Sequence, residues 1–415
     1  MKEPIRVFEH EALKVGVKGF KDKHLELLSK FLGDKGEEVF PYYTLIHNGV
    51  KFKHYVGVIS VGNLQIEVLP KADKYAGDDK AVWEDHLLAM LRVVYKLKVK
   101  IPSDADQKVK RSRVLDVFLN RFMDEVERLM HVGLVKAYRR VEDNRTSLKG
   151  RLVMSKHIVK NLVHQERFYV EYSTYDRNHI LNRLLYKALR VIPEVSASNH
   201  TILRAKTLMF EFPELNDVVV TESLFNRLSF DRKTEDYREA IELAKMILLN
   251  YMPNMTYQRG NNVIALMFDM NRLWEEFVYV TLKRKLPDYT VLAQSIKEFW
   301  KSDRVGGKTI RPDIVVLNEK GRCVAVLDTK WKCPTDGKPS DADLKQMFSY
   351  HEYWKTRHTA LLYPGKSDQV TGQFVINITG TPNPLECSMI YLPISSEKKL
   401  DFLDTEEITR YILRT

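Results

Sequence analysis

The residues with the clearest chemical potential are two aspartates and a lysine within residues 311–332, RPDIVVLNEKGRCVAVLDTKWK. Asp313 opens one short, β-branched apolar run, and Asp328 and Lys330 close a second run. The polar residues 318–322 between the runs are typical of a turn, so the stretch predicts a β-hairpin. Because Asp328 and Lys330 are two positions apart, they lie on the same face of their strand.

The two aspartates are expected on one side of this hairpin. A two-residue loop at Lys320–Gly321 places Asp313 directly opposite Asp328. A four-residue loop over residues 318–321 still leaves both carboxylates on one face, whereas an odd-length loop or a bulge would separate them.

This combination of side chains suits chemistry on a phosphate ester. Hard cations prefer oxygen ligands, and Mg²⁺ usually takes one or two carboxylates together with a substrate phosphate. A lysine beside them can hold or activate a water, or stabilise charge that develops on phosphorus. The alternative interpretation is a hairpin whose strand ends are only solvated by charged residues.

The composition is that of an ordinary soluble protein with an excess of positive charge. The chain has 415 residues, 44% hydrophobic and 29% charged, which is enough for two or three domains. Its formal net charge of +11 is consistent with a polyanionic partner. The three cysteines form no CxxC pair, and no stretch approaches the ~20 apolar residues of a membrane helix. We therefore expect a cytoplasmic protein without a signal peptide and without contact with a membrane.

The hydrophobic pattern predicts an α+β protein of several domains. Residues 1–80 are expected to be rich in β-strands, and residues 81–256 to be mainly helical. The last domain is expected over residues 257–415, after the polar run YQRGNN at residues 257–262. The basic stretch at residues 96–113 is interpreted as a solvated linker.

An acidic residue is expected on a helix that precedes the hairpin. A long helix is predicted over residues 263–286, because its apolar residues recur at helical spacing. Glu275 lies nearer than Glu276 to the edge of the apolar face. The face itself comprises Leu266, Met270, Leu273, Trp274, Phe277 and Val280.

A second helix is predicted over residues 341–354, after the hairpin, with Ser340 or Asp341 as its cap. Gln346 and Tyr350 are four residues apart and therefore share a face of this helix. The alternatives to a direct chemical role are a surface amide or a bond to the sheet for Gln346, and a core position for Tyr350.

The C-terminal region has a characteristic order of elements: the helix with Glu275, then the hairpin, then the helix with the QxxxY spacing. The C-terminal region thus resembles the PD-(D/E)xK nuclease superfamily. The whole chain resembles the McrC family, the nuclease subunits of McrBC modification-dependent restriction systems. The matching stretches are Tyr55–Ile59, Ile66–Lys71, Leu148–Leu152, Asp176–Asn178 and Met270–Glu275.

The resemblance implies roles for individual residues in a C-terminal α/β domain with a central mixed sheet flanked by helices. Lys330 would be the catalytic lysine, and Gln346 and Tyr350 would support the metal-bound water or a DNA phosphate. The implied ligands of Mg²⁺, or of Mn²⁺, are Asp313, Asp328 and Glu275. Glu276 is adjacent to Glu275 and is the alternative for the third acidic position.

The resemblance also implies a partner. Proteins of the McrC family join a ring of McrB-like AAA+ subunits, which hydrolyse GTP, read modified cytosine and translocate DNA. The N-terminal part, here residues 1–80, would engage this ring and stimulate GTP hydrolysis, while the C-terminal part cuts double-stranded DNA in defence against foreign DNA.

No nucleotide or other cofactor is expected on this chain itself. The GGKT stretch at residues 306–309 imitates the end of a P-loop, but Ser302 stands where the motif needs a glycine. Pro312 also prevents the helix that should follow. GTP would therefore be bound by the partner.

Two other functions fit parts of the pattern. One is a non-catalytic adaptor that activates a AAA+ motor, which the complete set of Asp313, Asp328 and Lys330 argues against. The other is a stand-alone RecB-like repair nuclease, which the large domain before residue 260 argues against.

Overall fold

The chain is α+β, with five separate sheets among the residues that the structure describes. The structure is a computed structural model. It describes residues 4–35, 41–61, 64–72, 80–95, 114–196, 198–252, 263–302, 304, 306–332, 334, 337–365, 367–375, 385–394 and 405–413.

Two compact units make up the chain, and each is built from separate segments. The first unit contains Met1, residues 60–63 and residues 111–266. The second unit contains residues 2–59, 64–110 and 267–415. The predicted domain limits at residues 80 and 256 stay predictions.

The first unit is centred on a group of helices. Helix α5 packs against α6 and α8, and α3 packs against α5, α6 and α8. The apolar faces of α5 and α8 are buried, which explains their helical periodicity in the sequence. The helices of this unit are α3 (Val114–Val132), α5 (Ile180–Val195), α6 (Asn199–Glu211), α7 (Glu222–Asn226), the 3₁₀ helix η2 (Glu235–Tyr237) and α8 (Arg238–Leu249).

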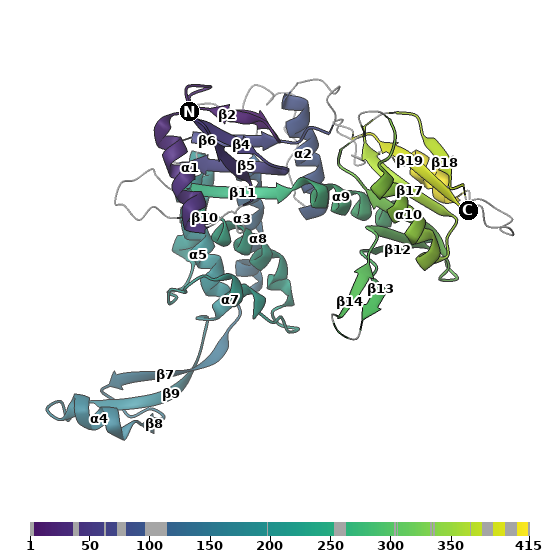
Figure 1. The fold of residues 1–415 in the computed structure, drawn as a ribbon. Helices are drawn as coiled ribbons and strands as arrows, with labels where there is room; N and C mark the ends of the chain where they lie inside the picture. The colour runs from purple at the N-terminus through teal and green to yellow at the C-terminus, as the bar shows by residue number, and fades with distance from the viewer. Residues whose placement is uncertain are drawn as a thin grey trace. The chain divides into compact units, whose positions relative to one another are not determined.

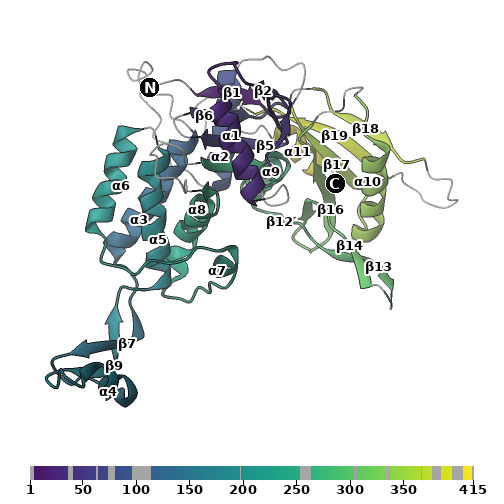
Figure 2. The same cartoon turned by 60° about the vertical axis from the view of Figure 1, so that its left-hand side comes forward.

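A long antiparallel hairpin with a small helix, which we call the finger, extends from these helices (Figures 1 and 2). Its elements are β7 (Ala137–Arg145), β8 (Arg151–Leu152), α4 (Met154–Asn161) and β9 (Phe168–Asp176). β9 lies between β7 and β8 and pairs antiparallel with both. The sequence analysis did not predict these strands, because β7 is polar almost throughout and lacks the alternation of a half-buried strand.

The N-terminal part of the second unit contains parallel and antiparallel strand pairs. β1 (Ile5–Phe8) pairs parallel with β6 (Leu64–Leu69), and β5 (Tyr55–Val61) is the other neighbour of β6. A separate antiparallel sheet has the order β2-β4-β3, from β2 (Ala12–Lys14), β3 (Tyr43–Ile46) and β4 (Gly49–Phe52). The helices are α1 (Asp22–Lys35) and α2 (Lys80–Tyr95).

The prediction of a strand-rich N-terminus with an early helix is confirmed. The strands expected at residues 55–60 and 64–69 correspond to β5 and β6, and the early helix to α1. The linker predicted at residues 96–113 and the polar run at residues 257–262 lie outside the described residues.

The helix predicted over residues 263–286 is wrong in its first part. Val263–Asp269 form the strand β11, and the helix α9 spans Met270–Lys285. The first six residues of β11 are all buried, and such a short continuous apolar run cannot be told from a buried helix by periodicity. Asp269 is extended and caps α9, since its side chain accepts hydrogen bonds from the backbone N–H groups of Asn271 and Arg272. The first residues of β11 belong to the first unit, where they pair antiparallel with β10 (Tyr251–Met252).

The C-terminal part of the second unit is a six-stranded mixed sheet with the order β12-β15-β16-β17-β19-β18. The pairs β16–β17 and β17–β19 are parallel, and the others are antiparallel. Helix α9 packs against β12 and β16, α10 against β16 and β17, and α11 against β19. The bounds are β12 (Thr290–Ala293), β15 (Ile314–Leu317), β16 (Cys323–Thr329), α10 (Asp341–Trp354), β17 (His358–Pro364), β18 (Val370–Gln373), β19 (Glu386–Leu392) and α11 (Glu406–Leu413).

An additional two-stranded ribbon is inserted between β12 and β15. It consists of β13 (Lys297–Ser302) and β14 (Gly306–Ile310), which pair antiparallel. The glycines of the GGKT stretch therefore belong to a strand and not to a nucleotide-binding loop.

Among the described helices, none combines the length and the apolar character needed to cross a membrane.

Candidate active site

The predicted hairpin is formed by β15 and β16, and its register brings the two aspartates to one end. Ile314 pairs with Leu327, so the next position outward places Asp313 opposite Asp328. The loop between the strands has an odd length, residues 318–322, which alone would have separated the carboxylates. A bulge between Val316 and Leu317 shifts the register by one residue and cancels this offset.

Asp328 is the buried centre of the site. Only 3% of its surface is exposed, at the end of β16. Its Oδ2 lies 2.8 Å from Lys330 Nζ, and its Oδ1 accepts from Gln346 Nε2 at 3.3 Å. Burial raises the pKa of Asp328 to about 6, and the nearby Asp313 carboxylate adds to the shift.

The predicted helix over residues 341–354 is α10, and it carries Gln346 and Tyr350 into the site. Gln346 Nε2 is 2.6 Å from the Tyr350 hydroxyl. That hydroxyl lies 3.4 Å from Asp328 Oδ1 and 3.1 Å from the carbonyl oxygen of Arg311, so its single proton is donated to one of the two. Tyr350 is buried in the core, as one of its two interpretations predicted, and its hydroxyl lies near Asp328, while its direct chemical role stays a prediction.

Asp343 is a site residue that the sequence analysis missed. Its Oδ1 is 2.9 Å from Lys330 Nζ, so the lysine bridges Asp343 and Asp328. Ser340, one of the two predicted caps, holds this carboxylate with a 2.7 Å hydrogen bond and accepts from the Asp343 N–H. The signal was the spacing of Asp343, Gln346 and Tyr350 at i, i+3 and i+7, which is one helix face.

The charge state of Lys330 follows from these two contacts. Burial acts to lower its pKa, but the carboxylates of Asp328 and Asp343 outweigh burial and raise the pKa to about 12. Lys330 is therefore a cation at neutral pH. It can donate hydrogen bonds and stabilise negative charge, and it does not serve as a general base.

Asp313 is held at the opposite strand. Its Oδ2 accepts from the backbone N–H and the hydroxyl of Thr329, both at 2.7 Å. The backbone carbonyl of Asp313 accepts from the N–H of Gln294 at 2.8 Å. Gln294 has a φ of 47°, a left-handed conformation that is uncommon outside glycine.

Gln294 links Asp313 to Glu275. Its Nε2 donates to Glu275 Oε1 at 2.7 Å. Burial raises the pKa of Glu275 to about 7, and the Asp313 carboxylate contributes to the increase. Glu276 forms a 3.2 Å ion pair with Arg272 instead. Of the two glutamates, Glu275 is thus the one bonded to the residue that holds Asp313.

The Asp313 carboxylate contributes to the raised pKa of both Glu275 and Asp328, which is the electrostatic situation that a bound cation relieves. Within the described residues, no group of three or more His, Cys, Asp or Glu side chains is arranged to hold a metal. A pair of aspartates suffices for Mg²⁺, which keeps several waters and needs one or two carboxylates. Asp313 and Asp328 fit such an ion, and Glu275 as a further ligand stays a prediction.

The pH dependence of stability tests this electrostatic assignment. The folded-state pKa of Glu275 is raised above its ordinary value of 4.5 to about 7. Its contribution to stability is therefore complete below about pH 4.5 and is lost as the pH rises through about 7. We expect the unfolding temperature in EDTA to fall between about pH 5 and pH 8, and to fall less for Glu275→Gln. Thermal melts with Glu276→Gln as the control check this, and equal slopes for Glu275→Gln and wild type would contradict it.

The residues after Lys330 are anchored to the beginning of the chain. Trp331 is buried and donates from Nε1 to Glu9 Oε1 at 2.6 Å, while Lys332 Nζ lies 2.7 Å from His10 Nε2. Burial raises the pKa of Glu9. Trp331 also packs on Trp274 of α9, with ring centroids 5.6 Å apart. The strand end that carries Lys330 is thus fixed by residues more than 300 positions away, which no local pattern could reveal.

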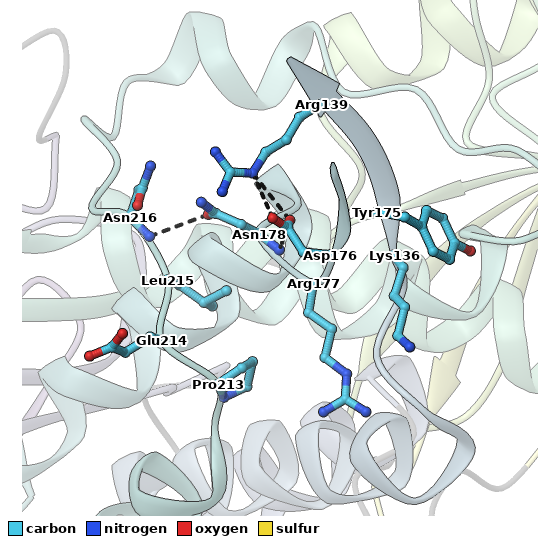
Figure 3. A pocket seen from close by; sticks show the side chains of 10 residues that line it. All are labelled: Lys136, Arg139, Tyr175, Asp176, Arg177, Asn178, Pro213, Glu214, Leu215 and Asn216. Carbon is cyan, nitrogen blue, oxygen red and sulfur yellow. Dashed lines mark hydrogen bonds and ion pairs between the residues drawn. The ribbon is translucent and has the colours of Figure 1, made fainter. Parts of the chain in front are cut away.

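A pocket of about 700 Å³ lies at the base of the finger in the first unit (Figure 3). Arg139 pairs with Asp176 at 2.9 Å, and Asn178 accepts from Arg183 of α5 at 2.7 Å. Asp176–Asn178, one of the stretches that carried the resemblance, therefore fastens the finger to α5. The lining residues are Lys136, Arg139, Tyr175, Asp176, Arg177, Asn178, Pro213, Glu214, Leu215 and Asn216.

The family described as "McrBC 5-methylcytosine restriction system component" matches residues 50–364. The chain belongs to this family. The family resemblance noted in the sequence is confirmed.

One solved structure shares this fold. One chain of a Thermococcus gammatolerans assembly, described as McrB AAA+ hexamers with bound McrC, is 22% identical with a TM-score of 0.65. The match covers 99% of both chains. A chain of the Thermococcus gammatolerans McrBC complex is 24% identical with a TM-score of 0.48, over 68% of this chain and 88% of the other. A search of curated proteins gave no match.

Proposed function

We propose that this McrBC-family protein is a metal-dependent endonuclease subunit of the PD-(D/E)xK type. In this proposal it docks on a McrB-like AAA+ GTPase ring and cleaves double-stranded DNA that contains modified cytosine. The observation that carries the proposal is the bridging of Lys330 between Asp328 and Asp343, with Asp313 on the adjoining strand. A merely solvated strand end does not require a buried acid or an ordered lysine.

Each residue has a separate task in phosphodiester hydrolysis. Mg²⁺ held by Asp313 and Asp328 would polarise the phosphate and acidify a bound water. Lys330, held as a cation, donates to the negative charge that develops on the phosphate oxygens. Gln346 and Tyr350 orient the Asp328 carboxylate through its Oδ1, which leaves Oδ2 to the lysine.

The proposed partner is a ring like the McrB hexamers of the Thermococcus assembly. Residues 1–80 were expected to dock, and that remains a proposal. The finger is the stronger candidate, because large apolar side chains concentrate on it with their surfaces in water. Val159 and Val163 are 81% and 84% exposed, and they are joined by Met154, Ile158 and Leu162.

Reconstitution with the AAA+ partner tests the division of labour. We expect Lys330→Gln to stimulate GTP hydrolysis as wild type does but to cut no DNA, because the docking surface is intact. We expect Val159→Glu with Val163→Glu to lose most of the stimulation. Val219→Glu is the matched control, since Val219 is 82% exposed in the same unit but outside the finger.

Three results of this experiment would decide between functions. Cleavage by Lys330→Gln at the wild-type rate would remove the active-site assignment. Full stimulation by the finger variant would exclude the finger as the docking surface. Stimulation without any cleavage by the wild-type protein would indicate the non-catalytic adaptor.

A further inference from the structure

The ribbon of β13 and β14 is exposed on both faces and adds little to the core, where only Ile310 at the end of β14 packs against the buried cluster among the residues that the structure describes. Nearly all of its described residues are exposed, and Trp300 has 49% of its surface in water. Two-stranded ribbons of this size are marginal by themselves. A function outside the core is therefore the better explanation for its presence.

The base of the ribbon is anchored to α10. The Tyr353 hydroxyl donates to the carbonyl oxygen of Phe299 at 3.1 Å, and the two rings are 5.7 Å apart. Lys297 Nζ donates to the carbonyl oxygen of Tyr353 at 2.5 Å and lies over the Trp354 ring. These contacts fix the direction of the ribbon, so that it projects from the sheet near β12 and α10 (Figures 1 and 2).

The ribbon is connected to the candidate active site at the beginning of β13 and at the end of β14. β13 begins shortly after Gln294, which bonds to Glu275 and to Asp313. β14 ends at Ile310, and the next residues lead into Asp313 itself. A molecule bound along the ribbon is consequently held beside the carboxylates.

The outer part of the ribbon combines cations with an aromatic side chain. Lys308 stands directly across from Trp300, and Lys301 stands across from Gly307, which offers no side chain. Arg304 is exposed near the tip. Among the described residues, no ion pair engages Lys301, Arg304 or Lys308. The described part of the ribbon holds one acidic residue, Glu298.

The shape of the ribbon agrees with the size of a DNA groove. A two-stranded ribbon enters the major groove of a duplex, and a six-residue strand spans about 20 Å. The lysine and arginine side chains of such a ribbon face phosphates on both sides of the groove. A protein partner would be matched instead by an apolar patch like that of the finger.

We propose that the ribbon of β13 and β14 lies in a groove of double-stranded DNA and holds the duplex over the site of Asp313 and Asp328. Lys301, Arg304 and Lys308 bind phosphates, and Trp300 packs against the sugar and base edges. The contacts are mainly with phosphates, so they carry no sequence preference. This inference rests on the proposed nuclease function, because it takes the same substrate.

The test compares two double variants that remove the same charge from two hairpins of the same unit. The ribbon variant is Lys301→Gln with Lys308→Gln. The control is Lys320→Gln with Arg322→Gln, in the exposed turn at the other end of β15. Fluorescence anisotropy with an unmodified duplex of about 30 base pairs, in EDTA and without the partner, measures binding over a range of salt concentrations.

We expect the ribbon variant to bind about tenfold more weakly near 100 mM salt, with a slope of log affinity against log salt that is smaller by about 2. The control should match wild type, and thermal melts should show that all proteins are folded. Trp300→Ala should weaken binding without changing the slope, because it removes no charge. Equal slopes for the ribbon variant and the control, or no binding by wild type, would overturn the proposal.

The binding assay separates this inference from the proposed function, because it needs neither metal nor cleavage. If the ribbon variant loses binding but wild type with its partner never cuts DNA, the ribbon proposal stands and the nuclease proposal fails. If wild type cuts and the ribbon variant binds and cuts equally well, the ribbon proposal alone fails.

Discussion

Asp328→Asn is expected to reduce DNA cleavage by the ring-bound protein by a factor of about a thousand. The substitution keeps the size of a side chain that is 3% exposed, so it creates no cavity. It removes the negative charge that faces Lys330 at 2.8 Å and, in our proposal, half of the metal's carboxylate ligands. The loss should therefore lie in the chemical step and not in DNA binding.

Cleavage of a methylated plasmid and calorimetry with Mg²⁺ measure the two parts of this prediction. The matched control is Asp341→Asn, which removes an exposed carboxylate from the first turn of α10, the helix that carries Asp343 and Gln346. Wild-type cleavage by Asp328→Asn would place the active site elsewhere. Loss of cleavage with unchanged Mg²⁺ binding would keep Asp328 in the site and exclude it as a ligand.

A fragment of residues 257–415 is expected not to fold. Helix α9 of this fragment packs against α2, which the fragment lacks, and Trp331 would lose its hydrogen bond to Glu9. Each large apolar side chain returned to water costs about 1.5–3 kcal/mol. Only a few such side chains exhaust the roughly 5–15 kcal/mol that stabilises a domain.

Circular dichroism and thermal melting of the fragment test this prediction. A matched deletion removes residues 138–175 and joins Ala137 to Asp176 with a short glycine linker. These two residues are paired across β7 and β9, so a short link spans them and the protein should still melt cooperatively. A cooperative melt of the 257–415 fragment itself would contradict the role given to the N-terminal segments.

The hairpin with Asp313 and Asp328 could be predicted from the sequence because its signals are local. Two short apolar runs and a polar turn predicted β15 and β16, and the helix spacing predicted Gln346 beside Tyr350. The relation of Asp313 to Asp328 was predicted from the wrong loop length, and it holds because an odd loop and a bulge compensate each other. Such compensation depends on the packing of the sheet and cannot be predicted from the hydrophobic pattern of the sequence.

Other parts of the site were beyond sequence reasoning for identifiable reasons. Glu9 meets Trp331 across 322 positions, so no periodicity connects them. Gln294 has a left-handed backbone and donates from its side-chain amide to Glu275. No sequence pattern predicts either property for a glutamine. Asp343 could have been found, because it shares a helix face with Gln346 and precedes it by one turn.

The interruption of the second unit by residues 111–266 sets the order of events during synthesis. Ribosomes add about 5–20 residues per second, so about 16 to 64 seconds separate the emergence of Glu9 from that of Trp331. During this interval the whole first unit is synthesised and can fold. The segments β1, β6 and α2 belong to the second unit and cannot complete their packing until its C-terminal segments have been synthesised. Incomplete chains therefore contain no assembled candidate active site, and any chain that has this site already has a completely synthesised finger.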